Sequence, residues 1–462
     1  MSNETHTDFS QVFSLLTEGK IPELKELLST YMPDELSRLL EETEDELNQK
    51  NLFGLLDIKI ASEVFKFLEF DLQNYLLHSL AYEKMAALLN ELSPDDRTKF
   101  LEELPGAAVK ELLVLLDPEE RAITLSLLGF PEGSVGRLMT TDYLAVKKHW
   151  TVDQVLKYIR KYGKYSETIN VIYIIDDEGI LLDDIRIREF LFVSPETGVS
   201  DLMDSRYVAL SVNDDESAAI TVFRNNNRVA LPVINTKGVL LGIVTIDDVL
   251  RLAEEEDTED IQKMGGTEAL EEPYIDSSVY TLIQKRAGWL VLLFIGEMLT
   301  ASAMSFFEDE IARAVILAMF VPLIISSGGN TGSQAASLII RAMALGEIGI
   351  RDWWRVMKRE FVSGLALGII LGIIGFFRIF LWTFFTNIYG PHWLGIALTV
   401  GTSLLGVVMW GSLAGSMLPL IIKRMGADPA VSSAPFIATL VDVTGLIIYF
   451  SAAMLWLKGT LL

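Results

Sequence analysis

Cysteine is absent from the 462 residues of the chain, and only four histidines are present. Without cysteine, disulfides and thiolate metal sites are excluded. The histidines, at positions 6, 78, 149 and 392, are scattered and lack the spacing of metal ligands. A site for a soft or borderline transition metal is therefore not expected, and any bound metal should be a hard ion with oxygen ligands.

Positive charge is scarce in one part of the chain only. Residues 1–285 carry 27 Lys or Arg against 54 Asp or Glu, whereas residues 286–462 carry 11 against nine. The acidic balance of the first part argues against a nucleic-acid partner, which requires Lys and Arg to neutralise phosphates. It favours a cationic partner. Residues 1–11 show no basic segment followed by an apolar core, so no cleaved signal is expected.

Five long apolar segments lie in the second part, at about 287–307, 314–342, 361–382, 394–423 and 433–457. Each is long enough to cross a bilayer as a helix, which takes about 20 residues. Lys and Arg are concentrated before the first segment, between the second and third, and between the fourth and fifth. Because positive loops stay inside, this alternation predicts a multi-pass protein of the cell membrane with a cytoplasmic N-terminus and an external C-terminus.

The second apolar segment contains a polar, glycine-rich stretch, SSGGNTGS at 326–333, shortly after Pro322. We expect this stretch to interrupt or loosen the helix, which at membrane depth is tolerated only beside protein or a water-filled path. Two interpretations remain open. The glycines suit close helix packing, whereas Asn330 and Gln334 suit a hydrophilic lining.

Asp442 is the only charged residue between positions 429 and 457. An Asp near the middle of a membrane helix costs about 2.5–3.5 kcal/mol on insertion scales. It is either a protonated side chain hydrogen-bonded inside the bundle or part of an ion path, where such residues are usually found. Because its segment contains no Lys, Arg or His, a cation from solution is the natural partner. Glu297, in the first segment, is either a functional acid or a structural hydrogen-bonding group.

The soluble part contains two regions that differ in predicted secondary structure. Residues 1–130 are predicted to be helical throughout, with a repeat at 92–104 and 116–128 in which Ser93 and Asp117 stand at N-caps before a proline and two acids. From about 137 the pattern becomes strand, helix, strand, turn, strand, helix, and it occurs twice. This tandem layout resembles a pair of CBS modules, which bind nucleotides or ions and act as sensors.

A dense acidic helix, IDDVLRLAEEEDTEDIQKM, follows the second module and should end at Gly265–Gly266. We expect it to be continuous with the first membrane segment. A solvated acidic face is the default interpretation. Like charges at this density repel, however, and divalent cations that bridge them to another domain would relieve the repulsion.

Three stretches closely resemble the MgtE family of bacterial magnesium transporters: ISSGGNTGSQAASLIIRAMALGEI, DWWRVMKREF and DPAVSSAPFIATLVDVTGLIIYF. The resemblance covers the whole chain. It implies a multi-domain membrane protein with an all-α helical-repeat N-domain, an α/β tandem CBS pair, an acidic connecting (plug) helix and a five-helix all-α transmembrane domain. The implied domains are residues 1–135 (N-domain), 136–200 and 201–253 (CBS modules), 254–285 (plug) and 286–462 (transmembrane pore).

The resemblance also implies a homodimer in the lipid bilayer with one central pore, lined by the second and fifth membrane helices. Asp442 matches the family Asp that recognises hydrated Mg²⁺. Asn330 and the carbonyl near Ala438 match groups that line the same path. Asp428 matches an acid near the cytoplasmic mouth.

Regulation is implied at the cytoplasmic acids that bind Mg²⁺ in the family and hold the plug helix against the pore. The matching residues are Glu63, Asp95, Asp248, Glu256, Glu259 and Asp260. Arg251 and Asn227 replace acids of the family pattern, and Ala434 replaces an Asn, so we expect fewer or weaker regulatory sites and a relaxed pore mouth. The family's CBS modules also bind ATP, and Arg188 and Glu189 stand where an Arg-Asp pair would.

The favoured function is a Mg²⁺-selective channel or transporter in which Mg²⁺ is both cargo and regulator. Alternatives are a transporter of Co²⁺ or Mn²⁺, an anion channel with CBS modules, and a membrane-anchored cation or nucleotide sensor. The lack of His, Cys and Met at the polar pore positions argues against a transition metal, and the lone intramembrane carboxylate argues against anions. No nucleophile–base pair or phosphate-cradling loop is evident, so no enzymatic activity is expected.

Overall fold

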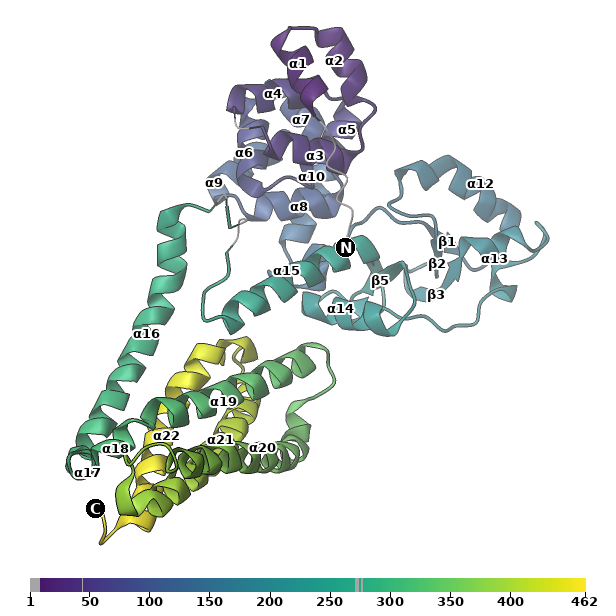
Figure 1. Cartoon of the computed structure of the whole chain (residues 1–462). Coiled ribbons are helices and arrows are strands. Elements are labelled where there is room, and N and C mark those ends of the chain that lie inside the picture. Colours follow the sequence, from purple (N-terminus) through teal and green to yellow (C-terminus); the bar gives the residue numbers. More distant parts are fainter. Residues whose placement is uncertain (1–8, 44, 271–273, 276) are drawn as a thin grey trace. The chain divides into compact units, whose positions relative to one another are not determined.

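The structure, a computed structural model of the whole chain, describes residues 9–43, 45–270, 274–275 and 277–462. It separates into two compact units, Met1–Ala253 and Glu254–Leu462. The first unit holds a helical domain and two small α/β modules (Figure 1). The second holds the end of an acidic helix and a set of long apolar helices.

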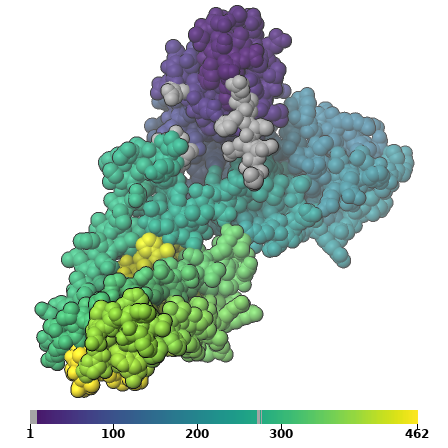
Figure 2. Space-filling view, viewed as in Figure 1, coloured from purple at the N-terminus to yellow at the C-terminus, as the bar shows by residue number. Residues whose placement is uncertain are grey.

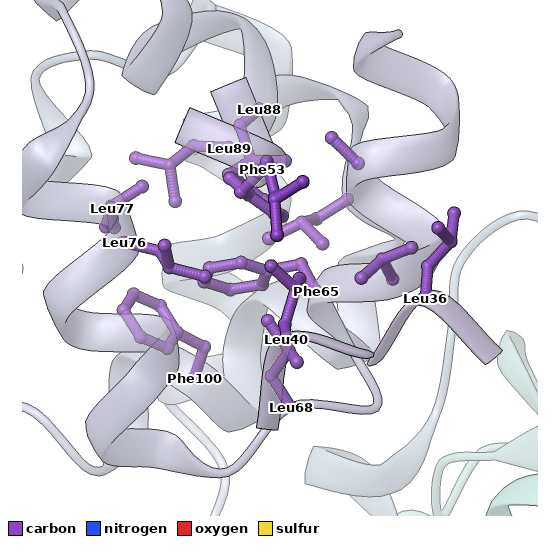
Figure 3. Packing of buried hydrophobic residues seen from close by; sticks show 14 of the residues in the cluster. Leu36, Leu40, Phe53, Phe65, Leu68, Leu76, Leu77, Leu88, Leu89 and Phe100 are labelled. Carbon is purple, nitrogen blue, oxygen red and sulfur yellow. The ribbon is translucent and has the colours of Figure 1, made fainter. Parts of the chain in front are cut away.

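Ten short helices build the helical domain within the described residues, in agreement with the sequence prediction. Their apolar faces meet in one core, in which Phe65 and Phe100 lie edge to face with ring centroids 5.2 Å apart (Figure 3). Ser93 caps one helix by accepting a hydrogen bond from the Asp96 backbone N–H at 3.4 Å. The helices are α1 (Ser10–Thr17), α2 (Ile21–Leu28), α3 (Pro33–Glu41), α4 (Glu46–Leu55), α5 (Ile58–Phe65), α6 (Phe70–Ser79), α7 (Tyr82–Glu91), α8 (Pro94–Glu102), α9 (Gly106–Leu113) and α10 (Pro118–Leu128).

The two α/β modules follow a short helix, α11 (Val135–Leu138), and show the predicted order of elements. The strands are β1 (Ala145–Lys147), β2 (Val171–Ile175) and β3 (Leu181–Arg186), then β4 (Leu210–Ser211), β5 (Ala230–Ile234) and β6 (Leu240–Thr245). The helices are α12 (Val152–Tyr162) and α13 (Ile187–Leu191), then α14 (Glu216–Asn225) and α15 (Ile246–Met264). In each module the central strand pairs in parallel with the first and antiparallel with the third. The central strands are apolar because they are buried along most of their length.

The acidic helix α15 ends before the membrane part begins. Gly266 follows it with a φ of +77°, a left-handed conformation that glycine adopts readily after a helix. The next helix, α16 (Val279–Phe306), starts with its own N-cap, where the Ser278 hydroxyl accepts from the Thr281 N–H at 3.1 Å. The expectation that the acidic helix continues into the first membrane segment is therefore wrong, because a glycine stop and a new serine cap separate the two helices.

Within the described residues, five helical spans are long and apolar enough to cross a membrane, as predicted. They are Val279–Phe306, Val315–Ala344, Ile350–Trp382, Gly390–Arg424 and Ala434–Leu457. Besides α16, their main helices are α19 (Val321–Ala344), α20 (Trp353–Trp382), α21 (Trp393–Arg424) and α22 (Ala434–Leu457), and α17 (Glu308–Arg313) and α18 (Val315–Ala318) connect α16 to α19. On the face drawn in Figure 2, green helices cover most of the yellow α22. Helix α16 differs from the others, because only 6 % of its apolar stretch is buried within the chain.

The glycine-rich stretch at 326–333 does not interrupt the second span. Helix α19 is continuous from Val321 to Ala344, so the expected break is wrong. Pro322 lies in the first turn, where its missing N–H costs no hydrogen bond. The irregular backbone comes earlier, at 319–320, between α18 and α19. The glycines stay helical because neighbouring helices pack directly on them.

Candidate functional site

The glycines of α19 allow α21 and α22 to approach its backbone closely. A Cβ atom at Gly328 would lie 2.3 Å from Val407 Cγ1 and 2.7 Å from Val441 Cγ1. A Cβ at Gly332 would lie 2.7 Å from Ile437 Cγ2. These separations are shorter than van der Waals contact, so no larger residue fits without displacing a neighbour. Close packing, one of the two interpretations of this stretch, is therefore part of its role.

Asp442 lies at this same close approach. A Cβ at Gly329 would lie 3.4 Å from Ala438 Cβ and 3.9 Å from Asp442 Oδ1. The carboxylate of α22 thus faces the glycine backbone of α19, and Asn330 is the next residue along that helix. The structure places Ala438 and Asp442 against Gly329, the residue before Asn330. The resemblance assigns Asn330, Ala438 and Asp442 to the ion path.

A polar stripe runs along α19 beside this carboxylate. Ser326, Asn330 and Gln334 are spaced four residues apart, share one helix face and are all exposed in the single chain. The Asn330 amide donates to Ser326 Oγ at 3.4 Å. One turn away, the Ser333 hydroxyl donates to the backbone carbonyl of Ala434 at 3.1 Å. An exposed polar stripe at membrane depth requires water or another protein surface to cover it.

A second carboxylate approaches Asp442 from α16. A Cβ at Gly296 would lie 2.7 Å from Thr439 Cγ2, so α16 packs tightly on α22 one turn before Asp442. Glu297, next to that glycine, is close enough to Asp442 for their negative charges to repel. Within the described residues Glu297 makes no hydrogen bond and neither acid has an ion-pair partner, which leaves the structural interpretation of Glu297 without support.

The end of α15 contacts the loop before α22. Lys263 Nζ lies 2.7 Å from Asp428 Oδ2 and 2.5 Å from Glu259 Oε1. The other carboxylate oxygen of Asp428 accepts from the Ala430 N–H at 2.8 Å. Burial, and then the charge of Asp428, raise the pKa of Asp260 above its usual value. Three of the predicted regulatory or pore acids are therefore close together, with a lysine among them that the sequence interpretation missed.

The turn after α15 also reaches the membrane helices. Gly266 is buried, and a Cβ there would lie 2.7 Å from Trp289 Nε1 and 3.2 Å from Pro435 Cγ. Trp289 in turn donates to Ser433 Oγ at 3.2 Å. The turn after α15 therefore contacts Trp289 of α16 and the first turn of α22, the helix that carries Asp442.

Another acid group joins α8 of the helical domain to the start of α15 in the first unit. Asp95 is buried, and its Oδ1 has no hydrogen-bond partner among the described residues. Burial, followed by the charges of Asp96 and Asp248, raises the pKa of Asp95. Asp248 accepts from Thr245 Oγ1 at 2.5 Å and forms an ion pair with Arg251, whose Nη2 also lies 3.4 Å from Asp96 Oδ1.

The remaining predicted regulatory acids are less closely grouped. Glu63 on α5 is exposed and forms an ion pair with Lys66 at 2.9 Å. Glu256 lies on α15, three residues before Glu259. In the part of the chain that the structure describes, no group of three or more Asp, Glu or His side chains is arranged to hold a metal. Three of the predicted regulatory acids, Glu63, Asp248 and Glu259, form ion pairs with basic neighbours.

The α/β modules enclose a cavity of about 410 Å³. Glu189 lines it as predicted for a nucleotide site, whereas Arg188 is not among its lining residues. The fully buried Asp184 forms an ion pair with Arg228 at 2.7 Å, and burial raises the pKa of Asp184 to about 6. The arginines of the cavity were missed because each flanks a strand distant in sequence from the others. They are Arg186, Arg206 and Arg228.

Family models match most of residues 11–255 and residues 321–452. The MgtE family, described as a divalent cation transporter, matches residues 321–452. The MgtE intracellular N domain matches residues 11–133, and the CBS domain matches residues 135–197 and 199–255.

Whole-length relatives share the same description. Magnesium transporter MgtE of Thermus thermophilus is 35 % identical over 450 residues, which cover 96 % of this chain and 97 % of that protein. Magnesium transporter MgtE of Bacillus subtilis is 27 % identical over 446 residues, with 96 % of both chains covered.

Solved structures resemble the soluble part. A crystal structure of the cytosolic domain of the Mg²⁺ channel MgtE in complex with ATP is 31 % identical with a TM-score of 0.51, and covers 52 % of this chain and 98 % of that one. The soluble part of a magnesium transporter is 25 % identical with a TM-score of 0.50, and covers 54 % and 97 %.

Proposed function

Since the chain belongs to the MgtE family of magnesium transporters, we propose that it admits Mg²⁺ into the cytoplasm through a pore between two copies, with Asp442 of each facing the ion. It is a multi-pass membrane protein whose N-terminal region is cytoplasmic. The observation that carries the proposal is the position of Asp442 Oδ1, 3.9 Å from where a Cβ at Gly329 would lie, beside the polar stripe of α19.

The chemistry of Mg²⁺ suits these groups. The ion loses its water reluctantly and prefers oxygen ligands in octahedral geometry. Two Asp442 carboxylates would hold it through its water molecules, while the Asn330 side chain and the backbone carbonyl near Ala438 accept hydrogen bonds from the same waters. Binding through waters is weak enough for the ion to leave, which conduction requires. The positive ion offsets the cost of placing each carboxylate at membrane depth.

Two features of the single chain support a homodimer. The polar stripe of Ser326, Asn330 and Gln334 is exposed, and lipid cannot satisfy its hydrogen bonds. Helix α16 is buried over only 6 % of its apolar stretch and carries Glu297 on its exposed surface. A second copy that packs against α19 and α16 would cover the stripe and enclose a hydrated path along it.

We propose further that cytoplasmic Mg²⁺ closes this pore through the acids of α15 acting as a plug. Burial, and then the charge of Asp428 across the contact between α15 and the loop before α22, raise the pKa of Asp260. A divalent ion bound there would remove the repulsion and strengthen the contact. The buried Gly266 would then hold Trp289 and Pro435 in the closed arrangement.

The cavity between the α/β modules is our proposed nucleotide site. A solved relative of the soluble part is described in complex with ATP, and this cavity offers three arginines for phosphates. It also contains Asp183, Asp184, Asp204 and Glu189, so phosphate binding competes with internal ion pairs. ATP would have to separate Arg228 from Asp184 to use that guanidinium.

Transport is tested by Mg²⁺ uptake into proteoliposomes. Asp442→Ala should abolish uptake while the protein still assembles, and Asp309→Ala, at an exposed acid of α17, should leave it unchanged. Uptake by Asp442→Ala at the wild-type rate would contradict the pore assignment. Uptake of Co²⁺ or Mn²⁺ without Mg²⁺ would keep the pore and change the ion, and absence of any uptake would favour a membrane-anchored sensor.

A further inference from the structure

Arg251 occupies the position between the helical domain and the second α/β module where negative charges meet. Its Nη2 forms an ion pair with Asp248, three residues earlier on α15, and lies 3.4 Å from Asp96 Oδ1 on α8. The guanidinium is 32 % exposed, and the carboxylates of Asp96 and Asp248 are 13 % and 9 % exposed. One side chain therefore links two domains through residues that are 155 positions apart in sequence.

The acids at this contact need a positive charge. Asp95 and Asp248 are buried, and burial raises the pKa of both. Charges in a partly buried site are weakly screened, so three carboxylates without a counterion would push α8 and α15 apart. A guanidinium beside two of them stabilises their charged forms and keeps the elements in contact.

Other basic side chains near the contact are already engaged. Arg97, on the same helix α8, is fully buried and donates to Thr124 Oγ1 at 2.8 Å and to the Leu92 carbonyl at 3.1 Å. Lys66 forms its ion pair with Glu63, although its charge also acts on Asp96. Arg137 on α11 forms an ion pair with Glu102 of α8 at 2.6 Å. Arg251 is the basic residue that reaches α8 from α15 within the described part of this contact.

We infer that Arg251 is a built-in cation that fastens the helical domain to the second α/β module without a metal ion. The attachment is permanent at any Mg²⁺ concentration, and Mg²⁺ regulation is left to the acids farther along α15, near Asp428. What this inference says about gating rests on the proposed Mg²⁺ regulation. The metal-independent attachment of the two domains is argued from the ion pairs of Arg251 and does not depend on that proposal.

The attachment can be measured in the full-length protein because the chain has no cysteine of its own. Cysteines replacing Glu111 on α9 and Lys237 in the turn between β5 and β6, both exposed, carry spin labels for distance measurement by double electron–electron resonance. Labelled chains are co-expressed with excess unlabelled chain so that distances within one copy dominate. The samples contain either EDTA or millimolar Mg²⁺.

The wild-type protein should give one narrow distance distribution in EDTA and the same one in Mg²⁺. Arg251→Ala should broaden it in EDTA, with about a tenfold loss in the ratio of attached to detached domain, as expected when a hydrogen-bonded charge is removed. Asp96→Asn removes the partner on the other domain and should act in the same direction. Arg224→Ala, at an exposed arginine of α14, is the matched control and should change nothing.

Two results would overturn the inference: broadening of the wild-type distribution in EDTA, or narrow distributions in EDTA for both Arg251→Ala and Asp96→Asn. Because no transport is measured, these results are independent of the pore assignment. Loss of the proposed function would appear separately, as Mg²⁺ uptake that does not need Asp442.

Discussion

Lys263 at the end of α15 and Asp428 before α22 form an ion pair, with Nζ 2.7 Å from Oδ2. The side chains are 27 % and 36 % exposed, so the pair is partly screened by water. Lys263 lies within the same acidic contact that we propose as the Mg²⁺-sensitive part of the gate. An ammonium at this position competes with a divalent ion for the same carboxylates.

Removing this ammonium should therefore change the response to cytoplasmic Mg²⁺. In Lys263→Ala, Asp428 and Glu259 lose their counterion and become available to Mg²⁺, so closure should require a lower Mg²⁺ concentration, by about two- to fivefold for a partly exposed pair. The measurement is proteoliposome uptake titrated with Mg²⁺ on the cytoplasmic side. Lys237→Ala, at an exposed turn, is the control. A variant that needs more Mg²⁺ to close would show that Lys263 itself holds the gate shut.

Glu297 should contribute to the ion path beside Asp442. Glu297→Gln keeps the size of the side chain and removes its charge, so Mg²⁺ uptake should fall, but less than in Asp442→Ala, because Asp442 is retained. The initial uptake rate at limiting external Mg²⁺ reports this difference. Glu310→Gln, on the short helix α17 after α16, should behave like wild type. A Glu297→Gln protein with the wild-type rate would assign Glu297 to a surface that the ion does not pass.

Two glycines of the membrane helices should respond differently to alanine. A Cβ at Gly415 would lie 2.1 Å from the Gly332 backbone oxygen, which cannot move away without shifting α19. Gly415→Ala should therefore destabilise the protein, by about 1–3 kcal/mol as for other overpacked sites. At Gly329 the nearest atoms are at ordinary contact distance, so Gly329→Ala should fold normally and reduce uptake by adding a methyl group beside Asp442.

Thermal unfolding of the purified protein in detergent measures the first effect, and proteoliposome uptake measures the second. Gly288→Ala, on α16 with its nearest neighbour 3.8 Å away, is the control for a glycine replacement in a membrane helix. Equal thermal midpoints for Gly415→Ala and Gly288→Ala would contradict the close packing of α19 on α21.

Asp142 should make the first unit less stable as the pH rises. Burial, and then the charge of Glu120, raise the pKa of Asp142 from 3.8 to about 6. Between these two values the folded protein binds more protons at this site than the unfolded chain, so this group's stabilisation is lost as pH rises through about 6. Asp142→Asn removes the charge and should be stabilising at pH 7.5, by about 1–2 kcal/mol, and about half as stabilising at pH 5.

Thermal midpoints at pH 5 and pH 7.5 check this sign. Asp177→Asn, at an exposed turn residue, serves as the control for replacing an Asp in the same module. An Asp142→Asn protein that is stabilised more at pH 5 than at pH 7.5 would show that the carboxylate gains a favourable partner when it ionises.

Local sequence by itself determined the elements of this protein. Five apolar stretches of membrane length, two strand–helix–strand–strand–helix patterns and the Ser93 cap are set by neighbouring residues, and the structure shows each of them. The glycine stop of α15 was also readable, because glycine adopts the positive φ that follows a helix. Asp442 could be singled out for the same reason, since a charge within an apolar run is costly without a partner.

Only the tertiary structure decided which distant groups meet. Arg251 contacts Asp96, which is 155 residues away, and Lys263 contacts Asp428, which is 165 residues away. No local pattern could therefore show that basic side chains lie among the predicted regulatory acids. The glycine run of α19 was expected to break its helix, but packing by α21 and α22 keeps it helical. Propensity acts within a few residues, whereas packing and ion pairs depend on how the chain folds back on itself.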